Sequence, residues 1–525
     1  MLAADASGTP WLHLADRAAA VAALGPLEGT TVTALRLTID AVDPAPGPWW
    51  PSLRPASGVT HLSVDRAGPG LDVVARCTPT DAAALVRSLL PLAGPLATAG
   101  SAGGPAVAPG GTLREQLAQP REPAAPLLRH SPLPPDPATP SPPGLDLATS
   151  NPVDRLGVVD LLAASATGRL ALGATGATLH VGGASLDVLR EPTAVAASLR
   201  AVLAVSVEAT SGPDGGPPGT SPATARAVAA VAASGAVLSA EALPGDLRQA
   251  LGEVLAAEVI APLPGPGARR AWEQRSIRQR REAMRRFGGR SIAPRGTLPA
   301  VSAVLVTKRP HYVDAALTAL EASTYPVLEV VLMLHGSDEV PTDLRERAAR
   351  SPLPVVLAAE PAGTVFGAAT ARAHAMASGD LLAKIDDDDS YGPEHVWDLV
   401  LAHAFSGADL VGKPPALVRL ESLGRAVWSA RYDTERYTDF VSGGTMLIGA
   451  DTLRAIGGWR PLAGGIDRAM LERVLGDGRL VYRTHGEGYV LVRHDVDHTW
   501  AVGATAFLGD TLAQWEDREA DLAGA

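Results

Sequence analysis

The chain has 525 residues, of which 46% are apolar, and this length is too great for one ordinary hydrophobic core, so about three or four folded units are expected. A formal net charge of −11 gives no general attraction to nucleic acid, and nucleic acid is not expected as a partner. Cys77 is the only cysteine, which excludes an intramolecular disulfide and a cysteine-rich metal site and favours a reducing, cytoplasmic location.

The first half of the chain is predicted to hold two folded units separated by a linker. Residues 1–103 combine a strand-like alternation over Thr31–Val42 with a helical pattern over Asp81–Leu90, which predicts a small α+β domain. Residues 104–152 contain 13 prolines, a density that prevents regular structure and favours an extended spacer. Residues 153–267 alternate Ala-, Val- and Leu-rich helical stretches with short apolar runs, which predicts an α/β domain.

A basic amphipathic helix and a connector are predicted over residues 268–298. Nine arginines lie between Arg269 and Arg290, and the apolar side chains gather on one side of a helical wheel: Trp272, Ile277, Ala283, Met284 and Phe287. Such a helix can lie on an anionic membrane surface, which would make the protein peripheral to the inner face of the membrane, or grip a phosphate. Alternatively it packs its apolar side on a neighbouring domain. No stretch approaches the ~18 uninterrupted apolar residues of a membrane span.

From residue 299 onward, strands and helices are predicted to alternate regularly. The expected strands are Val301–Thr307, Leu328–Leu334, Pro354–Ala359 and Leu381–Ile385, and the expected helices are Val313–Ala322, Leu344–Ala349 and Ala368–Ala377. This alternation predicts an α/β fold with a doubly wound, mostly parallel sheet within residues 299–525. The strand ends would then share one edge, which brings Thr307, Lys308, Arg309 and His335 beside the residues that follow Ile385.

Four consecutive aspartates, Asp386–Asp389, follow the last of these strands directly. Four adjacent like charges are unfavourable unless something positive shares the site. Hard oxygen ligands at this density suit Mg²⁺ or Mn²⁺ holding a phosphate, although a solvated acidic loop would carry the same residues.

Residues 299–500 resemble the family 2 glycosyltransferases, which have the GT-A fold. Asp386–Asp389 is similar to the family's DxD element, and Val301–Thr307 to its opening strand. Further similar segments follow the family's order along the chain: Ser323-Thr324-Tyr325-Pro326 with Glu329, Gly367, Ala371-Arg372, Ser378-Gly379-Asp380, Gly443-Gly444-Thr445, Ile456-Gly457-Gly458-Trp459 and Asp467–Arg473.

The resemblance implies an inverting, metal-dependent transferase that moves a sugar from a nucleotide-sugar donor to a hydroxyl acceptor, such as a cell-envelope glycan or glycolipid. It implies Mg²⁺ or Mn²⁺ held by Asp386 with Asp388 or Asp389, and a late histidine, His494 or His498, that completes the metal shell. Asp467 corresponds to the general base. The donor side would comprise Thr307, Lys308, Arg309, His335, Arg372, Lys384, Asp386 and Asp387, and the acceptor side Gly443, Gly444 and Trp459.

Several roles have alternatives on chemical grounds. Asp467 opens a predicted helix, Asp467–Leu475, where a carboxylate is also a common cap. A late histidine can instead hydrogen-bond the diphosphate as a cation, or cap the strand Tyr489–Val492. Arg372 would pair with phosphate oxygens or neutralise the aspartates.

The chain also departs from the family pattern. Leu334-His335 stands where an aspartate pair usually contacts the nucleobase, Lys308-Arg309 stands where Tyr-Asn is common, and the asparagine expected near Ala373 is absent. Two other functions therefore stay open: a nucleotidyltransferase on a similar sheet, and a non-catalytic sugar- or partner-binding protein derived from a transferase.

Overall fold

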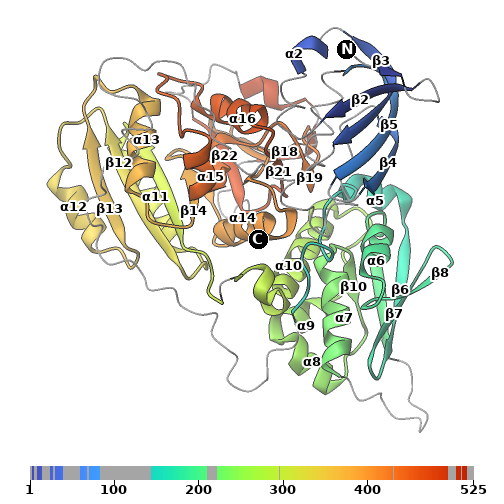
Figure 1. The fold of residues 1–525 in the computed structure, drawn as a ribbon. Helices are drawn as coiled ribbons and strands as arrows, with labels where there is room; N and C mark the ends of the chain where they lie inside the picture. The colour runs from blue at the N-terminus through green and yellow to red at the C-terminus, as the bar shows by residue number, and fades with distance from the viewer. Residues whose placement is uncertain are drawn as a thin grey trace.

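The structure is a computed structural model of the whole chain (Figure 1). It describes residues 144–209, 221–294, 296–429, 431–494, 504–509 and 511–516, together with stretches of the first 82 residues: 3–4, 9–14, 24–27, 30–39, 59–67 and 70–82.

The N-terminal unit is a sheet of five strands in the order β1-β2-β3-β5-β4. Its elements are β1 Ala3–Ala4, β2 Pro10–Leu14, α2 Leu24–Leu27, β3 Thr31–Ile39, β4 Val59–Ala67 and β5 Gly70–Asp81. The strand predicted from Thr31 is present as β3, in which Leu35 and Leu37 are fully buried. The helix predicted over Asp81–Leu90 begins at the end of β5, and its residues from 83 onward lie outside the described part of the chain, as do residues 104–143 of the predicted linker.

The second unit is a mixed sheet in the order β10-β9-β6-β7-β8 with helices packed on it (Figure 1). Its elements are α5 Val158–Ala164, β6 Thr167–Gly173, β7 Gly176–Val181, β8 Ala184–Asp187, α6 Pro192–Leu199, β9 Ala204–Ala209, α7 Pro222–Ala233, β10 Val237–Ser239, α8 Gly245–Leu251 and α9 Glu253–Ile260. Helix α7 begins after Ser221, whose hydroxyl accepts from the backbone N–H of Thr224. Its alanines are small enough to lie flat on the sheet and are almost all buried.

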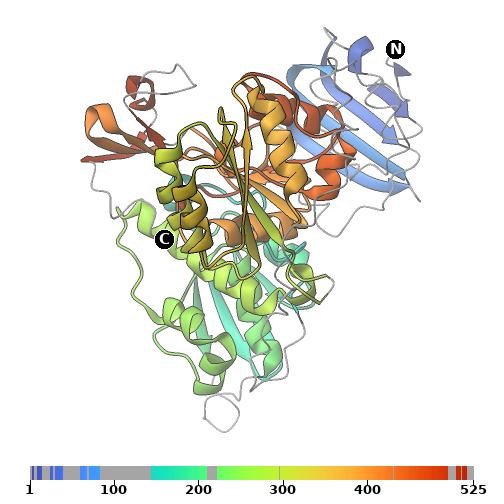
Figure 2. The same ribbon diagram turned by 90° about the vertical axis from the view of Figure 1, so that its left-hand side faces the viewer.

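Helix α10, Arg269–Phe287, is the predicted basic helix, and it runs between the second and third units (Figures 1 and 2). Trp272, Ile277 and Phe287 on its apolar side are buried, as the helical wheel predicts. Arg275, Arg280 and Arg281 are buried as well, because carboxylates of other elements face them: Arg280 pairs with Glu435, and Arg281 Nε lies 2.8 Å from Asp398 Oδ1. Helix α10 therefore packs its apolar side on neighbouring units, as the second interpretation of the sequence expects. Most of its charge is not presented to a membrane.

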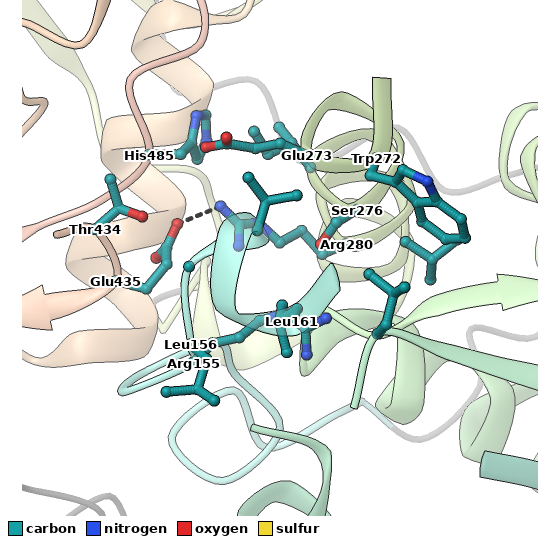
Figure 3. A pocket seen from close by; sticks show the side chains of 15 residues that line it. Arg155, Leu156, Leu161, Trp272, Glu273, Ser276, Arg280, Thr434, Glu435 and His485 are labelled. Carbon is teal, nitrogen blue, oxygen red and sulfur yellow. Dashed lines mark hydrogen bonds and ion pairs between the residues drawn. The ribbon is translucent and has the colours of Figure 1, made fainter. Parts of the chain in front are cut away.

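Figure 3 shows the junction where α10 meets both neighbouring units. A cavity of about 40 Å³ lies there, lined by Arg155, Glu273, Arg280, Glu435 and His485 among other side chains. Burial and the nearby carboxylates of Glu487 and Glu435 raise the pKa of Glu273 to about 7. The junction is thus a network of compensating charges around a space that fits a few water molecules.

The third unit contains the predicted α/β sheet, in the order β13-β12-β11-β14-β20-β16-β21-β19. Its strands are β11 Val301–Thr307, β12 Leu328–His335, β13 Val355–Glu360, β14 Leu381–Ile385, β16 Leu410–Gly412, β19 Arg436–Tyr437, β20 Leu447–Gly449 and β21 Val481–Arg483. β13, β12, β11 and β14 are parallel, and their apolar runs are buried because helices cover the sheet. Those helices are α11 Val313–Glu321, α12 Thr342–Ala349, α13 Phe366–Met376, α14 His395–Ser406, α15 Ala450–Ala455 and α16 Ile466–Gly476.

A smaller sheet in the order β15-β22-β17-β18-β23 lies beside the large one. Its strands are β15 Ser390–Tyr391, β17 Leu417–Leu420, β18 Arg425–Ser429, β22 Tyr489–Arg493 and β23 Thr511–Glu516, and short 3₁₀ turns occur at Gly289–Ser291, Pro310–Tyr312, Glu421–Leu423, Gly443–Thr445 and Ala504–Phe507. The seven elements predicted over residues 301–385 are all present, and the predicted fold class is confirmed. No helix among the described residues combines the length and apolar content needed to span a bilayer. The domain boundaries at residues 103, 152 and 267 stay predictions.

Candidate active site

The acidic run lies at the edge of the sheet where β11, β12 and β14 end. β11 pairs in parallel with both β12 and β14, so Thr307 and His335, which end their strands, and Asp386, which follows β14, lie at that edge. This is the edge at which parallel α/β sheets bind ligands.

Asp387 is held by the end of β11. The hydroxyl of Thr307 donates to Asp387, and the guanidinium of Arg309 pairs with both of its oxygens. Arg309 Nη2 also lies 2.7 Å from Asp388 Oδ2, so one arginine neutralises two neighbouring aspartates. The side chain of Asp387 is 6% exposed and that of Asp388 is 21% exposed, so Asp388 is the more accessible of the two.

Lys384 joins the acidic run to the predicted base. It is buried on β14, and its Nζ lies 2.5 Å from Asp386 Oδ1 and 3.3 Å from Asp467 Oδ1. Asp467 is in the first turn of α16, as predicted, and the N-cap residue of that helix is Gly465. Desolvation raises the pKa of Asp467, Lys384 opposes this, and Asp386 adds to it. A carboxylate with a raised pKa is a stronger base.

Asp389 is engaged inside the fold. Its two oxygens accept from the hydroxyl of Tyr489 at 2.7 Å and from the backbone N–H of Val492 at 3.0 Å. A second tyrosine, Tyr391, donates to the carbonyl of Gly444 and accepts from the N–H of Asp386. Sequence reasoning did not identify these tyrosines, although Tyr391 stands two residues after the acidic run.

The late histidine His494 lies beside the acidic run. Its Nδ1 is 2.8 Å from Glu421 Oε2, and its Nε2 is 3.1 Å from the backbone oxygen of Asp388. Both neighbours are hydrogen-bond acceptors, so the ring of His494 is held between Glu421 and the acidic run. The metal role and the diphosphate role of His494 stay predictions. The other candidate, His498, lies outside the described residues.

Three predicted donor residues, Lys308, His335 and Arg372, have surroundings that differ from one another. Lys308 is exposed at the end of β11. His335 Nε2 lies 2.6 Å from the backbone oxygen of Thr364, which precedes α13. Arg372 pairs with Glu360 at the end of β13, and not with the aspartates as one alternative proposed, because three strand spacings separate β13 from β14.

The two glycines of the predicted acceptor side allow the backbone to lie close to the carboxylates of Asp467 and Asp386. A Cβ at Gly443 would overlap the carboxylate of Asp467, and a Cβ at Gly444 would lie 2.9 Å from Asp386 Oδ2. Trp459 is different: it is 2% exposed and packs in the core, with its ring centroid 5.2 Å from that of His374. It supports α13 and α16 from behind and presents no surface to an acceptor.

The acidic run is also a candidate metal site. No three His, Cys, Asp or Glu side chains are grouped around a common point within the part of the chain that the structure describes. Mg²⁺, however, is commonly held by one or two carboxylates together with substrate phosphates. Asp386 and Asp388, 32% and 21% exposed, are the members of the run that provide such carboxylates at the surface.

Comparison with known proteins identifies this unit. Residues 303–427 match the sequence profile described as Glycosyl transferase family 2. The chain carries a family 2 glycosyltransferase domain. The family that the sequence predicts is thereby confirmed for this segment, and the matched residues contain most of β11, all of β12 to β14 and the whole acidic run. Among curated proteins, none matches the chain.

Solved structures resemble the transferase domain distantly. Staphylococcus aureus TarS 1-349 in complex with UDP-GlcNAc is 17% identical with a TM-score of 0.32, over 39% of this chain and 62% of that one. Mannosyltransferase PcManGT from Pyrobaculum calidifontis, in complex with GDP-Man and Mn²⁺, is 18% identical with a TM-score of 0.31, over 38% of this chain and 59% of that one. The match therefore spans less than two thirds of either protein.

Proposed function

We propose that the chain transfers a sugar from a nucleotide-sugar donor to the hydroxyl group of an acceptor, with inversion at the anomeric carbon. The single observation that carries this proposal is the pairing of two carboxylates across Lys384, with Asp386 at the end of β14 and Asp467 at the start of α16. One-step displacement needs a base for the incoming hydroxyl and a separate means of stabilising the leaving diphosphate. In this proposal, Asp467 serves the first of these needs and Asp386 the second.

In the proposed reaction, Asp467 accepts the proton of the acceptor hydroxyl as the hydroxyl oxygen attacks the anomeric carbon. Lys384 holds Asp467 in place and limits the repulsion between it and Asp386. Arg309, with its fixed fork of donors, supplies positive charge beside Asp388 where the diphosphate would leave.

Asp386 and Asp388 would hold Mg²⁺ or Mn²⁺ together with oxygens of the donor diphosphate. When bound, the cation neutralises charge on the departing nucleoside diphosphate. The hard carboxylate oxygens of this run fit that class of ion.

Product analysis tests the function. The full chain is incubated with Mn²⁺ and a panel of UDP-, GDP- and dTDP-sugars, and the released nucleotide is identified. Release of nucleoside diphosphate supports sugar transfer, because the glycosidic bond to the diphosphate has been broken. In a parallel incubation with nucleoside triphosphates and sugar 1-phosphates, release of pyrophosphate would instead show a nucleotidyltransferase. No release, with donor binding that still raises the melting temperature, would show a non-catalytic sugar-nucleotide-binding protein.

A further inference from the structure

Two aromatic rings form a surface shelf at the same sheet edge as the acidic run. The rings of Tyr432 and Phe440 are stacked, with centroids 5.1 Å apart and an angle of 23° between their planes. Phe440 is 37% exposed, and it is the one aromatic residue among the exposed large apolar side chains of the described residues. Phe440 therefore offers part of an aromatic ring to solvent at this edge of the sheet.

A buried arginine holds this aromatic shelf, Tyr432 and Phe440, in place. Arg483 is the last residue of β21, and it donates to the backbone oxygens of Asp433 at 2.6 Å and Phe440 at 2.9 Å. Its guanidinium carbon also lies 5.5 Å from the centroid of the Tyr432 ring. One side chain therefore fixes both segments that carry the rings. The two rings are thus held in position before any ligand binds, as in a preorganised binding surface.

The shelf is continuous with the candidate active site. Phe440 is three residues before Gly443, so their Cα atoms are at most about 11 Å apart, and Gly443 touches the carboxylate of Asp467. β14, β16 and β21 run in the same direction, so Asp386 and Arg483 end strands at one edge. Three strand spacings, about 14 Å, separate those two ends.

A hollow adjoins the shelf on the side of Tyr432. Its volume is about 110 Å³, and it is lined by Pro415, Ser429, Arg431, Tyr432, Ala506, Phe507 and Gly509. The hollow places the guanidinium of Arg431 and the hydroxyl of Ser429 beside Tyr432, and together with the exposed ring of Phe440 this suits a ligand that has both an apolar face and polar edges.

We propose that Tyr432 and Phe440 form a subsite for a pyranose ring of the acceptor, so that the acceptor is a saccharide longer than one sugar unit. The inference rests on the proposed function, because it takes Asp467 as the end of the acceptor path. A pyranose presents a face of polarised C–H groups that complements the negative face of an aromatic ring, while its hydroxyl groups point outward to polar neighbours. The separation of about 14 Å leaves room for further sugar between the shelf and the reacting hydroxyl.

Binding of saccharides to the full chain tests the proposal directly. The probe is an immobilised panel of linear oligosaccharides of hexoses, N-acetylhexosamines and hexuronic acids. We expect at least one class to bind and its affinity to fall about 10-fold in Phe440→Ala, because the substitution removes the apolar surface that the sugar would cover. Phe440→Trp should retain binding. Val254→Ala, which trims a 57% exposed apolar side chain on α9, is the matched control and should bind normally.

A second readout separates this proposal from the proposed function. Phe440→Ala should leave nucleoside diphosphate binding with Mn²⁺ and the melting temperature unchanged, and with the bound saccharide as acceptor it should raise the acceptor KM and spare the donor KM. Saccharide binding that is equal in wild type and Phe440→Ala, or absent throughout the panel, would overturn the subsite. If the wild-type chain turns over no donor but its saccharide binding still depends on Phe440, the result counts against the transfer reaction and leaves the subsite in place.

Discussion

The four adjacent aspartates have four different surroundings. Asp387 is enclosed by Thr307 and Arg309, and Asp389 by Tyr489 and the N–H of Val492. Asp386 and Asp388 each keep exposed surface and a cationic neighbour. Adjacent residues at the end of a strand point in different directions, so one run of identical side chains supplies both internal braces and carboxylates that face a ligand.

The base role of Asp467 predicts a loss of turnover without loss of structure. In Asp467→Asn we expect kcat to fall by ~100-fold or more, because an amide cannot accept the acceptor's proton. Binding of the nucleotide sugar should persist. The comparison is with Asp451→Asn, since Asp451 is 90% exposed and pairs with Arg454 in the same helix. Equal turnover in the two variants would assign the base to another residue.

The contrast between Asp388 and Asp389 predicts opposite phenotypes for neighbouring substitutions. Asp389→Asn replaces one acceptor oxygen by an NH₂ group that faces a donor, and should lower the free energy of unfolding by about 1–3 kcal/mol in urea titrations. Asp388→Asn should leave that free energy within about 0.5 kcal/mol while abolishing the Mn²⁺-dependent part of nucleotide diphosphate binding. The assignment fails if Asp388→Asn binds the nucleotide with unchanged Mn²⁺ dependence.

At the scale of elements, α10 is a polar helix in a buried place. Its arginines meet carboxylates from other parts of the chain, among them Glu258 on α9, Asp398 on α14 and Glu487 before β22. Arg270 and Arg281 both reach the transferase domain, so the helix fastens that domain to the second unit by ion pairs as well as by its apolar side. Asp398 gathers Arg281, Lys413 and His485. Burial raises the pKa of Asp398, but the two cations Arg281 and Lys413 hold it well below its usual range.

Removing one partner of that group should be costly. Arg281→Ala leaves a carboxylate, 2% exposed, with one cation fewer, and we expect a loss of about 3–5 kcal/mol in the free energy of unfolding. Arg269→Ala, at the exposed start of the same helix, should change it by less than about 0.5 kcal/mol. Chemical denaturation of both variants measures the difference, and similar values would mean that the buried ion pair adds little.

On the scale of the whole molecule, one apolar core crosses from the second unit into the third. The same cluster of buried side chains contains Val205 of β9, Met284 of α10 and Leu305 of β11. Leu145 and Leu147 belong to it too, and the N–H of Leu145 donates to the carbonyl of Phe287. Residues at the end of the predicted linker are therefore part of the folded body.

This continuity predicts how fragments behave. A fragment of residues 144–525 should melt in one transition near that of the full chain and keep its nucleotide binding. A fragment of residues 296–525 lacks α10 and leaves Asp398 and Glu435 without their arginines, so it should be insoluble or melt at a much lower temperature. Circular dichroism melting and solubility measure this, and a stable 296–525 fragment would contradict the shared core.

The order of strands and helices from Val301 to Ile385, the position of the acidic run and the start of α16 at the candidate base all followed from the sequence, because periodicity and family motifs are local properties. The tertiary structure decided the partners. It placed Lys384 between Asp386 and Asp467, turned Asp389 inward, put Trp459 in the core and buried the arginines of α10. Each of these depends on which distant residue supplies the opposite charge or the covering surface, and that is set by packing between elements far apart in the chain.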